Sequence, residues 1–539
     1  MKILTAEEMG AADRRSVELG VSVRELMHNA GTAVARFALR NFAGDGLVVA
    51  VCGKGNNGGD GMVAAVAMAD AGRKVRVALL GHTDELKGDA AAAWKAVLEH
   101  SAIDAREIED EAALSNALEG AKLVLDAVVG TGFKPPLRGL ATSARDIIAK
   151  SGADVVAVDL PSGWDADSTA MSADGAFRAD AVVTFAAPKL AHVFGWMTSS
   201  VFGPVVVAPI GTPAKAIESK TGLHWSGAAK AIAEKPRGMD GNKGKFGHVL
   251  IVSGSYGTAG APSMASLAAL RTGAGLVTAA VPQVVADTVA RTAPELMVRP
   301  LWQAAAHRRQ EAYGVPSAAN LEPERLQELL KGITVIALGP GLSTKSGAVE
   351  FAREFVAKTT LPIVIDADGL NAFAGKTELL KQAAQSRTIV LTPHPGEMAR
   401  LVGMTVKEVE ADRVGLARRF ATEHGVTLVL KGWRTLVAHP DGSIAVNTTG
   451  NPSMAKGGSG DILTGIVAAM LAQYKDNVAE AVEAAVFLHG LAGDFACRAQ
   501  DEHTVLATDT VGHLWEAFRA RVTDTDGLTW ICGLAGANG

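Results

Sequence analysis

The chain has 539 residues, of which 48% are hydrophobic and 20% are charged, and its formal net charge is −5. This length exceeds what one hydrophobic core supports, so we expect at least two domains. The slightly acidic charge balance argues against nucleic acid or an anionic membrane as a partner.

The N-terminus and the cysteines bear on the cellular compartment. Glu7 and Glu8 make the start of the chain acidic too early for a secretory signal, and no apolar run reaches the roughly 18 residues of a membrane span. Cys52, Cys497 and Cys532 are few and scattered, which favours neither a disulfide framework nor a zinc site. We therefore expect a cytoplasmic protein.

The first half of the chain alternates between helical patterns and short valine-rich runs. A helical pattern covers about residues 6–40, and further helices are expected at residues 61–71 and 88–100. The runs that we predict as strands are residues 47–52, 75–80, 123–129, 155–160, 182–186 and 205–210. Short, continuous apolar runs are typical of strands buried on both faces of a parallel sheet. This alternation predicts a doubly wound α/β domain over residues 1–212.

Turn-forming residues interrupt this pattern at residues 213–240, where we expect a linker. A second α/β domain is predicted over residues 241–510, with helices at 461–474 and 477–499 and a hairpin formed by residues 435–438 and 443–446. Its other predicted strands are residues 248–252, 276–280, 335–338, 363–365, 389–391 and 427–430. Residues 511–539 are expected to form a C-terminal tail that exposes Trp530.

Three predicted strand ends in the first domain carry polar residues. One runs into the glycine loop 53–61, the second contains Asp126, and the third ends at Asp159. A strand-terminal Asp more often caps the backbone, but three such ends on one sheet edge favour a binding site. Oxygen ligands from Asn57, Asp126 and Ser162 would suit a monovalent or hard divalent cation. Lys189 follows a strand and either pairs with Asp159 or lies in solvent.

The strings at residues 56–61 and 159–163, together with the strand that contains Asp126, resemble the NAD(P)HX epimerase family. Its members interconvert the R and S forms of hydrated NADH and NADPH. The resemblance implies a Rossmann-like three-layer domain, potassium held by Asn57, Asp126 and Ser162, Asp159 as acid/base and Lys189 as its helper. The substrate-binding positions that it implies are Asn56, Asn57, Gly58, Gly59, Asp60, Gly130, Thr131, Gly132, Phe133, Lys134, Pro135, Pro136 and Asp159.

The second domain contains the string Gly457-Gly458-Ser459-Gly460-Asp461 at the start of a predicted helix. A helix N-terminus offers unpaired N–H groups and a partial positive charge, so it is a ready site for a phosphate. Asp461 either caps the helix or acts as a base toward a substrate hydroxyl beside that phosphate. The string alone leaves both interpretations open.

Other strand ends of this domain point to the same cleft. His394 lies between two prolines and is either structural or functional. Asp366 and Asp368 could hold magnesium, or Asp368 could cap the helix after Gly369, and we favour the cap. Glu397 could contact a metal or water near phosphate, and Lys431 faces a phosphate or ends its strand in solvent.

These strings, with residues 247–255 and 392–398, resemble the ribokinase-like superfamily and, more narrowly, the ADP- or ATP-dependent NAD(P)HX dehydratase. The resemblance implies that Asp461 deprotonates the hydrate hydroxyl, which attacks the phosphate of Mg²⁺-bound ADP. The phosphate ester then eliminates, leaving AMP, phosphate and a restored nicotinamide double bond.

The same resemblance implies the ligand positions of this domain. The substrate positions are Ala261, Gly341, His394 and Asp461, and the nucleotide positions are Lys431, Gly432, Trp433, Arg434, Thr435, Lys456, Gly457, Gly458, Ser459 and Gly460. The string 451–456 departs from the family pattern at Ser453 and Lys456. The added charge of Lys456 would tighten nucleotide binding or change the preference between ADP and ATP.

The sequence thus predicts a bifunctional enzyme that repairs NADHX and NADPHX at the expense of ADP, with potassium and magnesium as cofactors. Because superfamily relatives often assemble, we also expect a homo-oligomer. The alternative enzyme is a ribokinase-like small-molecule kinase with a nucleotide-binding regulatory N-terminal domain. A third possibility, in which the first domain is only a binding module or scaffold, is disfavoured by Asp159.

Overall fold

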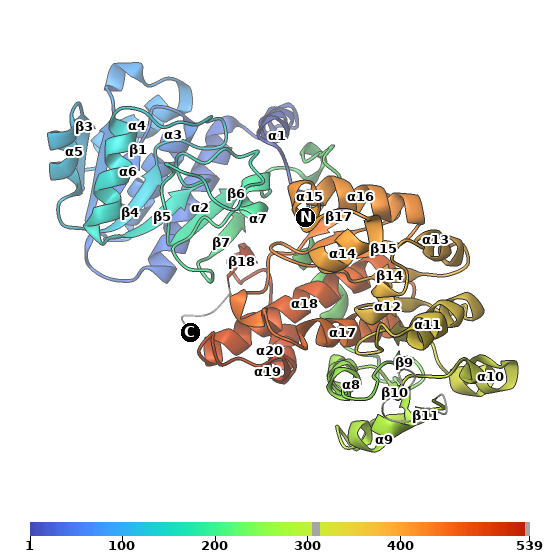
Figure 1. Cartoon of the computed structure of the whole chain (residues 1–539). Coiled ribbons are helices and arrows are strands. Elements are labelled where there is room, and N and C mark those ends of the chain that lie inside the picture. Colours follow the sequence, from blue (N-terminus) through green and yellow to red (C-terminus); the bar gives the residue numbers. More distant parts are fainter. Residues whose placement is uncertain (304–312, 534–539) are drawn as a thin grey trace. The chain divides into compact units, whose positions relative to one another are not determined.

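The computed structural model describes residues 1–303 and 313–533, which divide into two compact units (Figure 1). The first unit contains Met1–Leu223 and the described residues from Arg521 onward, and the second contains His224–Ala520. Within the described residues, no helix is both long and apolar enough to cross a lipid bilayer.

The first unit is built on an eight-stranded sheet with the strand order β18-β7-β6-β5-β4-β1-β2-β3. Adjacent strands from β7 to β3 are parallel, and β18 pairs with β7 in the antiparallel sense. The strands are β1 (Leu47–Cys52), β2 (Val75–Leu80), β3 (Ile103–Ile108), β4 (Ala121–Ala127), β5 (Asp154–Val158), β6 (Ala181–Phe185), β7 (Val205–Ala208) and β18 (Thr529–Cys532).

Helices cover both faces of this sheet. On one face α2 (Val23–Asn41), α3 (Asn56–Asp70) and α4 (Gly88–Glu99) pack together, and their core includes Val48, Ala50 and Cys52 of β1. Val49 and Val51 alternate with these residues and are buried toward the opposite face, as the two-residue period of a strand requires. There α5 (Glu111–Leu118) packs against α6 (Leu140–Ser151), which completes the predicted three layers.

The second unit is built on a ten-stranded sheet with the order β11-β10-β9-β12-β13-β14-β15-β16-β17-β8. The strands from β11 to β15 are parallel, whereas β16 and β17 form antiparallel pairs beside β15. The strands are β8 (Leu223–Trp225), β9 (His248–Val252), β10 (Leu276–Pro282), β11 (Met297–Leu301), β12 (Val335–Leu338), β13 (Ile363–Ile365), β14 (Ile389–Leu391), β15 (Thr427–Leu430), β16 (Leu436–Ala438) and β17 (Ile444–Val446).

Helix α17 (Ser459–Gln473) is the central helix of this unit. It packs between α8 (Gly260–Thr272) and α18 (Val478–Ala499), and nearly all its residues beyond the first turn are buried. Gly465 permits this packing, because a Cβ atom at that position would lie 2.1 Å from the carbonyl oxygen of Ala265 on α8. The remaining helices of the unit are α9 (Gln283–Ala290), α10 (Pro323–Leu330), α11 (Ser346–Lys358), α12 (Asp368–Asn371), α13 (Glu378–Ala384), α14 (Pro395–Val402), α15 (Val406–Ala411), α16 (Arg413–His424), α19 (Ala507–Gly512) and α20 (Leu514–Arg519).

The α/β class and most strands agree with the sequence analysis, but several elements differ. The helical pattern at 6–40 forms two helices, α1 (Ala6–Glu18) and α2, because Gly20 adopts a φ of 97° and Ser22 caps α2. The sequence analysis missed β3 and β11, which are edge strands with partly exposed side chains and lack a continuous apolar run.

The expected linker and tail also differ from the structure. Residues of the expected linker form β8 and a 3-10 helix at Ser226–Ala233, where Trp225 and Lys230 are almost fully buried within the second unit. Residues of the expected tail form α20 and β18, and Trp530 is buried against Phe37 rather than exposed. Residues 534–539 of that expected tail lie outside the described residues.

Candidate active sites

The first candidate site is a cavity of about 690 Å³ in the first unit, at the carboxyl ends of four neighbouring strands. Asn57 follows β1, Thr131 follows β4, Asp159 follows β5 and Lys189 follows β6. The carboxyl ends of adjacent parallel strands meet at one edge, so the order β6-β5-β4-β1 brings these side chains together.

The glycine string expected to be a loop is the first turn of α3. Helix α3 starts at Asn56 rather than near Gly61, and Gly55 is its N-cap residue. Gly58 is required for close packing, because a Cβ atom there would lie 1.9 Å from the carbonyl oxygen of Gly53. The N-terminus of α3 therefore faces the cavity directly, as a site for an anionic ligand requires.

Asp159 is held by a dense set of polar contacts. Its Oδ1 accepts hydrogen bonds from Lys189 Nζ at 2.7 Å and Thr184 Oγ1 at 2.8 Å, and its Oδ2 accepts from the backbone N and Oγ1 of Thr131. The backbone of Asp159 has a φ of 67°, a strained conformation that often occurs at functional sites. Burial by itself raises the pKa of Asp159, but the Lys189 ammonium and these donors hold that pKa well below its ordinary value.

His192 completes this arrangement and was missed by the sequence analysis. Its ring is fully buried; Nδ1 accepts from the backbone N of Lys189 at 3.0 Å, and Nε2 lies 2.7 Å from the carbonyl oxygen of Asp159. Burial and then Lys189 lower the pKa of His192 to about 4, so the ring is neutral at neutral pH and Nε2–H donates to that carbonyl. No motif in the sequence singled out this histidine.

Two other carboxyl groups in the cavity have the opposite protonation preference. Burial first, and then the charges of Asp159 and Asp13, raise the pKa of Asp60 well above its ordinary value. Burial and Asp159 also raise the pKa of Asp13, against the opposing effect of Lys189. Asp13 comes from α1, which the sequence analysis did not connect with the site. One cavity therefore combines a carboxyl group whose pKa is lowered with two carboxyl groups whose pKa values are raised.

The structure brings most of the predicted substrate residues of the first unit to this cavity. Those that line it are Asn56, Asn57, Asp60, Gly130, Thr131, Gly132, Phe133, Asp159 and Lys189. Gly58, Gly59, Pro135 and Pro136 are not part of the lining. Lys134 is also outside it, and its Nζ forms ion pairs with Asp165 at 2.7 Å and Asp167 at 2.9 Å.

Asp126 and Ser162 lie behind the cavity wall rather than in it. Both are fully buried, and Asp126 accepts hydrogen bonds from Ser162 N at 2.7 Å and Ser162 Oγ at 2.6 Å. Ser162 Oγ also accepts from the backbone N of Val129, which lines the cavity. Burial raises the pKa of Asp126 to about 6. No ion pair to Asp126 occurs within residues 1–303 and 313–533, so its charge is uncompensated.

The second candidate site is a cavity of about 690 Å³ in the second unit, again at strand ends. Asp366 follows β13, His394 follows β14 and Lys431 follows β15, and these three strands are neighbours. The cavity also touches the first turn of α17, which begins after Gly458 with a φ of 97°. Asp461 is half-buried in that first turn.

Charged neighbours surround Asp461. Burial first and then the charge of Asp366 raise the pKa of Asp461 to about 6; Lys431 opposes this effect, and Asp368 and Glu397 add to it. A carboxylate with this pKa is mostly ionised at neutral pH and is a stronger base than an exposed aspartate. The electrostatics of the cavity are thus consistent with a base at Asp461.

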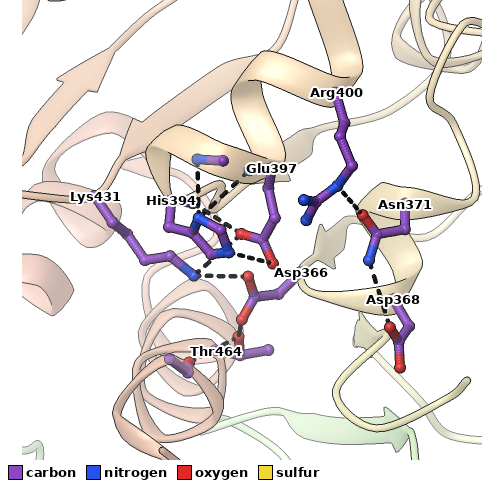
Figure 2. Close-up of polar contacts among 10 residues, drawn as sticks. Asp366, Asp368, Asn371, His394, Glu397, Arg400, Lys431 and Thr464 are labelled. Carbon is purple, nitrogen blue, oxygen red and sulfur yellow. Dashed lines mark hydrogen bonds and ion pairs between the residues drawn. The ribbon is translucent and has the colours of Figure 1, made fainter. Parts of the chain in front are cut away.

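His394, Glu397, Asp366 and Lys431 form a connected set (Figure 2). His394 is the N-cap of α14: its Nδ1 accepts from the backbone N of Gly396 at 3.0 Å, while Glu397 accepts from the backbone N of His394 at 2.8 Å. The carboxylate of Asp366 pairs with Lys431. Asp368, which the sequence analysis favoured as a cap, makes no capping bond to α12 and accepts from the backbone N of Ser343. Lys431 is mostly buried and does not end its strand in solvent.

The predicted residues of the second site divide into two groups. Those that line the cavity are His394, Lys431, Gly432, Trp433, Arg434, Thr435, Ser459, Gly460 and Asp461. Ala261 and Gly341 lie next to each other but outside the lining, as do Lys456, Gly457 and Gly458. Lys456 Nζ donates to the carbonyl oxygens of His503 at 2.7 Å and Val505 at 2.5 Å, so its charge anchors that loop.

The sequence analysis missed the wall of this cavity formed by residues 447–452 and α18. His489 of α18 is only 9% exposed, and its Nε2 has no hydrogen-bond partner among the described residues. Burial and Lys431 lower the pKa of His489 to about 4, so its ring is neutral. Asp494 of α18 supports this wall by accepting from the backbone N of Gly450 and from Asn451 Nδ2. Folding alone brings these residues to the strand ends.

Family models match both units. A model described as the YjeF-related protein N-terminus matches residues 23–191, and one described as NAD(P)H-hydrate dehydratase matches residues 249–515. The chain is 40% identical to the bifunctional NAD(P)H-hydrate repair enzyme of Moorella thermoacetica over 95% of this chain and 96% of that protein. It is 32% identical to the enzyme of the same name from Escherichia coli, over 96% of this chain and 94% of that protein.

Two solved structures are similar to slightly more than half of the chain. An ADP/ATP-dependent NAD(P)H-hydrate dehydratase from Bacillus subtilis, co-crystallised with ATP and Mg²⁺, is 27% identical, with a TM-score of 0.44, over 55% of this chain and 96% of that chain. A ribokinase-like superfamily protein from Enterococcus faecalis is 29% identical, with a TM-score of 0.45, over 56% of this chain and 97% of that chain.

Proposed function

The chain belongs to the family of bifunctional NAD(P)H-hydrate repair enzymes, and we propose that its first unit epimerises R- and S-NAD(P)HX while its second unit dehydrates the S form with ADP. The observation that carries the proposal is Asp461, a basic carboxylate in the first turn of α17 inside the second cavity. Hydration yields both epimers and only one is dehydrated, so the two activities complement each other.

In the dehydratase reaction, Asp461 removes the proton from the hydroxyl of the hydrate, and the oxygen attacks the terminal phosphate of ADP. The P–O bond to AMP breaks as the new one forms. Phosphate then leaves with the C–O electron pair, the neighbouring ring carbon loses a proton to water, and the ring double bond is restored. The backbone N–H groups at the start of α17 and the ammonium of Lys431 are suited to stabilising charge on the transferring group. Gly460 lets a phosphate approach the helix end closely.

Magnesium is expected to arrive with the nucleotide. Within the described residues, no group of three or more His, Cys, Asp or Glu is arranged to hold a metal ion. This agrees with the preference of Mg²⁺ for phosphate oxygens, water and one or two carboxylates over an all-protein cage. The residues that would face the complex are Lys431, Gly432, Ser459 and Gly460. Mg²⁺ would supply charge neutralisation on the phosphates.

In the epimerase reaction, the carbon that bears the hydroxyl is inverted. Loss of the hydroxyl requires a proton donor, and addition of water to the other face requires a proton acceptor. Asp60, which favours the protonated form, suits the donor, and ionised Asp159 suits electrostatic stabilisation and proton acceptance. Lys189 orients Asp159 and offsets its charge. The low pKa of Asp159 makes it a weak base, so we assign part of the acid/base work to Asp60.

A potassium ion is proposed behind the first cavity. The donor set fits a monovalent cation: Asp126 is a buried carboxylate without an ion-pair partner in the described chain, and Ser162 adds a hydroxyl oxygen. Asn57, which lines the cavity, would contribute its amide oxygen Oδ1. The cation would offset the buried charge of Asp126 and hold Asn57 at the cavity wall.

The proposal is tested with a mixture of R- and S-NADHX, Mg²⁺, K⁺ and either ADP or ATP. Recovery of reduced-nicotinamide absorbance is followed and the nucleotide product identified. Both epimers should be converted completely into NADH, with conversion of ADP into AMP. Asp461→Asn should abolish dehydration but keep epimerisation, and normal dehydration by that variant would remove Asp461 as the base. No recovery with either nucleotide would favour the small-molecule kinase with a regulatory N-terminal domain.

The compartment and assembly state complete the proposal. Cys52 and Cys497 are buried free thiols, which suits a reducing cytoplasm. We also propose a homo-oligomer, as expected from the resemblance to the ribokinase-like superfamily, and size-exclusion chromatography with light scattering measures it directly.

A further inference from the structure

Four acidic side chains and one lysine meet at the strand ends of the second unit. The acidic residues are Asp366, Asp368, Glu397 and Asp461, and the lysine is Lys431. They come from five different elements: the ends of β13 and β15 and the first turns of α12, α14 and α17. We call this set the acidic cluster. The proposed function uses Asp461 and Lys431 and leaves the buried Asp366 without a role.

Asp366 contacts two other elements at once, the end of β15 and helix α17. It is 1% exposed, and Oδ1 accepts from Lys431 Nζ at 2.9 Å. Its Oδ2 accepts from Thr464 Oγ1 at 2.7 Å, and Figure 2 shows the carboxylate between these two donors. Thr464 lies three residues after Asp461 on α17, so it shares a helix face with the proposed base. Asp366 therefore joins the lysine to α17 at Thr464, one turn beyond Asp461.

Lys431 has a second, weaker acidic partner. Its Nζ lies 3.7 Å from Glu397 Oε2, compared with 2.9 Å from Asp366. Glu397 is also engaged by the backbone N of His394 at 2.8 Å, so it is a shared acceptor (Figure 2). Asp368 lies on the other side, where it accepts from the backbone N of Ser343. Asp366 is thus the principal anchor of the ammonium group.

The charge of Asp366 acts directly on Asp461. After burial, it is the largest cause of the raised pKa of Asp461, and Lys431 is the main opposing group. Asp368 and Glu397 act in the same direction as Asp366 but less strongly. His394, Arg434 and His489 also face the cavity, from α14, the segment after β15 and α18. Removing the charge of Asp366 leaves Lys431 less neutralised, so both changes make Asp461 easier to ionise.

We propose that Asp366 is a positioning residue of the dehydratase site, whose carboxylate anchors Lys431 and Thr464 of α17 beside Asp461. In this position, the charge of Asp366 also keeps Asp461 a strong base. This inference rests on the proposed role of Asp461. It adds a function for a side chain that is buried below the reacting groups and donates nothing to the substrate.

The test is the pH dependence of kcat/KM for S-NADHX dehydration with Mg²⁺ and ADP. The wild-type rate should rise with pH through a midpoint near the pKa of Asp461, about 6, because the base must be ionised. Asp366→Asn keeps the shape but removes the charge, and we expect its midpoint about one pH unit lower. At low pH the variant then keeps a larger fraction of its maximal rate than the wild type does.

Two control variants separate charge from shape. Asp368→Asn removes the same charge from a side chain that accepts from Ser343 and Asn371 instead of Lys431 and Thr464, so its midpoint should move less. Asp366→Glu keeps the charge and should keep a midpoint near that of the wild type, with a lower kcat/KM. If Asp366→Asn does not fold, as judged by circular dichroism, Asp366→Ser removes the same charge with a smaller side chain.

The possible outcomes are distinct. A uniformly lower kcat/KM with an unmoved midpoint in Asp366→Asn would reduce Asp366 to a structural residue and overturn the inference. An equal or larger shift in Asp368→Asn would overturn its specific assignment. If Asp461→Asn still dehydrates, the proposed base is wrong; if Asp461→Asn is inactive and the Asp366→Asn midpoint stays in place, only the role of Asp366 fails.

Discussion

Potassium should stabilise this protein only where Asp126 is ionised. Burial raises the pKa of Asp126 from 3.8 to about 6. The folded protein therefore holds this proton more tightly than the unfolded chain does. The contribution of the protonated Asp126 to the free energy of unfolding is complete below pH 3.8 and is lost as the pH rises through about 6. The difference between these two pKa values corresponds to about 3 kcal/mol. A cation beside the carboxylate would recover part of this free energy of unfolding at higher pH.

The measurement is calorimetric unfolding of the intact protein in KCl or in tetramethylammonium chloride at equal ionic strength, between about pH 5 and pH 8. Potassium should raise the Tm at the upper pH by several degrees, since about 1 kcal/mol shifts the Tm of a domain of this size by roughly 2–4 °C. At the lower pH the increase should be small, because the protonated carboxyl group does not bind the cation.

Two variants make this prediction specific. Asp126→Asn removes the buried charge and should abolish the potassium effect at every pH. Asp45→Asn removes an exposed carboxylate of the same unit and should leave the effect intact. A potassium effect that is independent of pH, or one that persists in Asp126→Asn, would refute the reasoning.

Three further variants test how the sites and units are built. Arg413 donates to the carbonyl oxygens of Leu430, Lys431 and Trp433. Arg413→Ala should therefore raise the KM for ADP about tenfold, and Arg413→Lys should recover part of the loss. An unchanged KM would contradict this anchoring role. Gly465→Ala should lower the free energy of unfolding in urea by about 1–3 kcal/mol, because its Cβ would lie 2.1 Å from a carbonyl oxygen of α8, whereas Gly512→Ala meets open space and should be nearly neutral. Trp530→Ala should lower the free energy of unfolding by about 3–5 kcal/mol in the same assay, since the indole packs on Phe37 and its Nε1 donates to Asp524. A decrease below about 1 kcal/mol would indicate that this segment is a tail, as the sequence analysis expected.

The sequence alone determined the α/β class and most central strands of both units. Runs such as 248–252 and 335–338 are fully buried on both faces, so their valine and isoleucine content identifies them without reference to distant residues. The motif residues Asp159, Lys189, Lys431 and Asp461 were also visible, because strand ends and glycine-rich helix starts have local signatures. The edge strands β3 and β11 were not visible, since one-sided burial leaves no continuous apolar run.

Tertiary structure alone decided what surrounds these residues. Asp13 on α1 and His489 on α18 are far in sequence from the motifs, and only the folding of their helices over the strand ends brings them to the cavities. The same holds for β18, whose antiparallel pairing with β7 joins residues more than three hundred positions apart in the chain. Protonation preferences were equally invisible, because burial and neighbouring charges set them. The sequence determines which groups are available, and the three-dimensional packing determines which of them carry a proton.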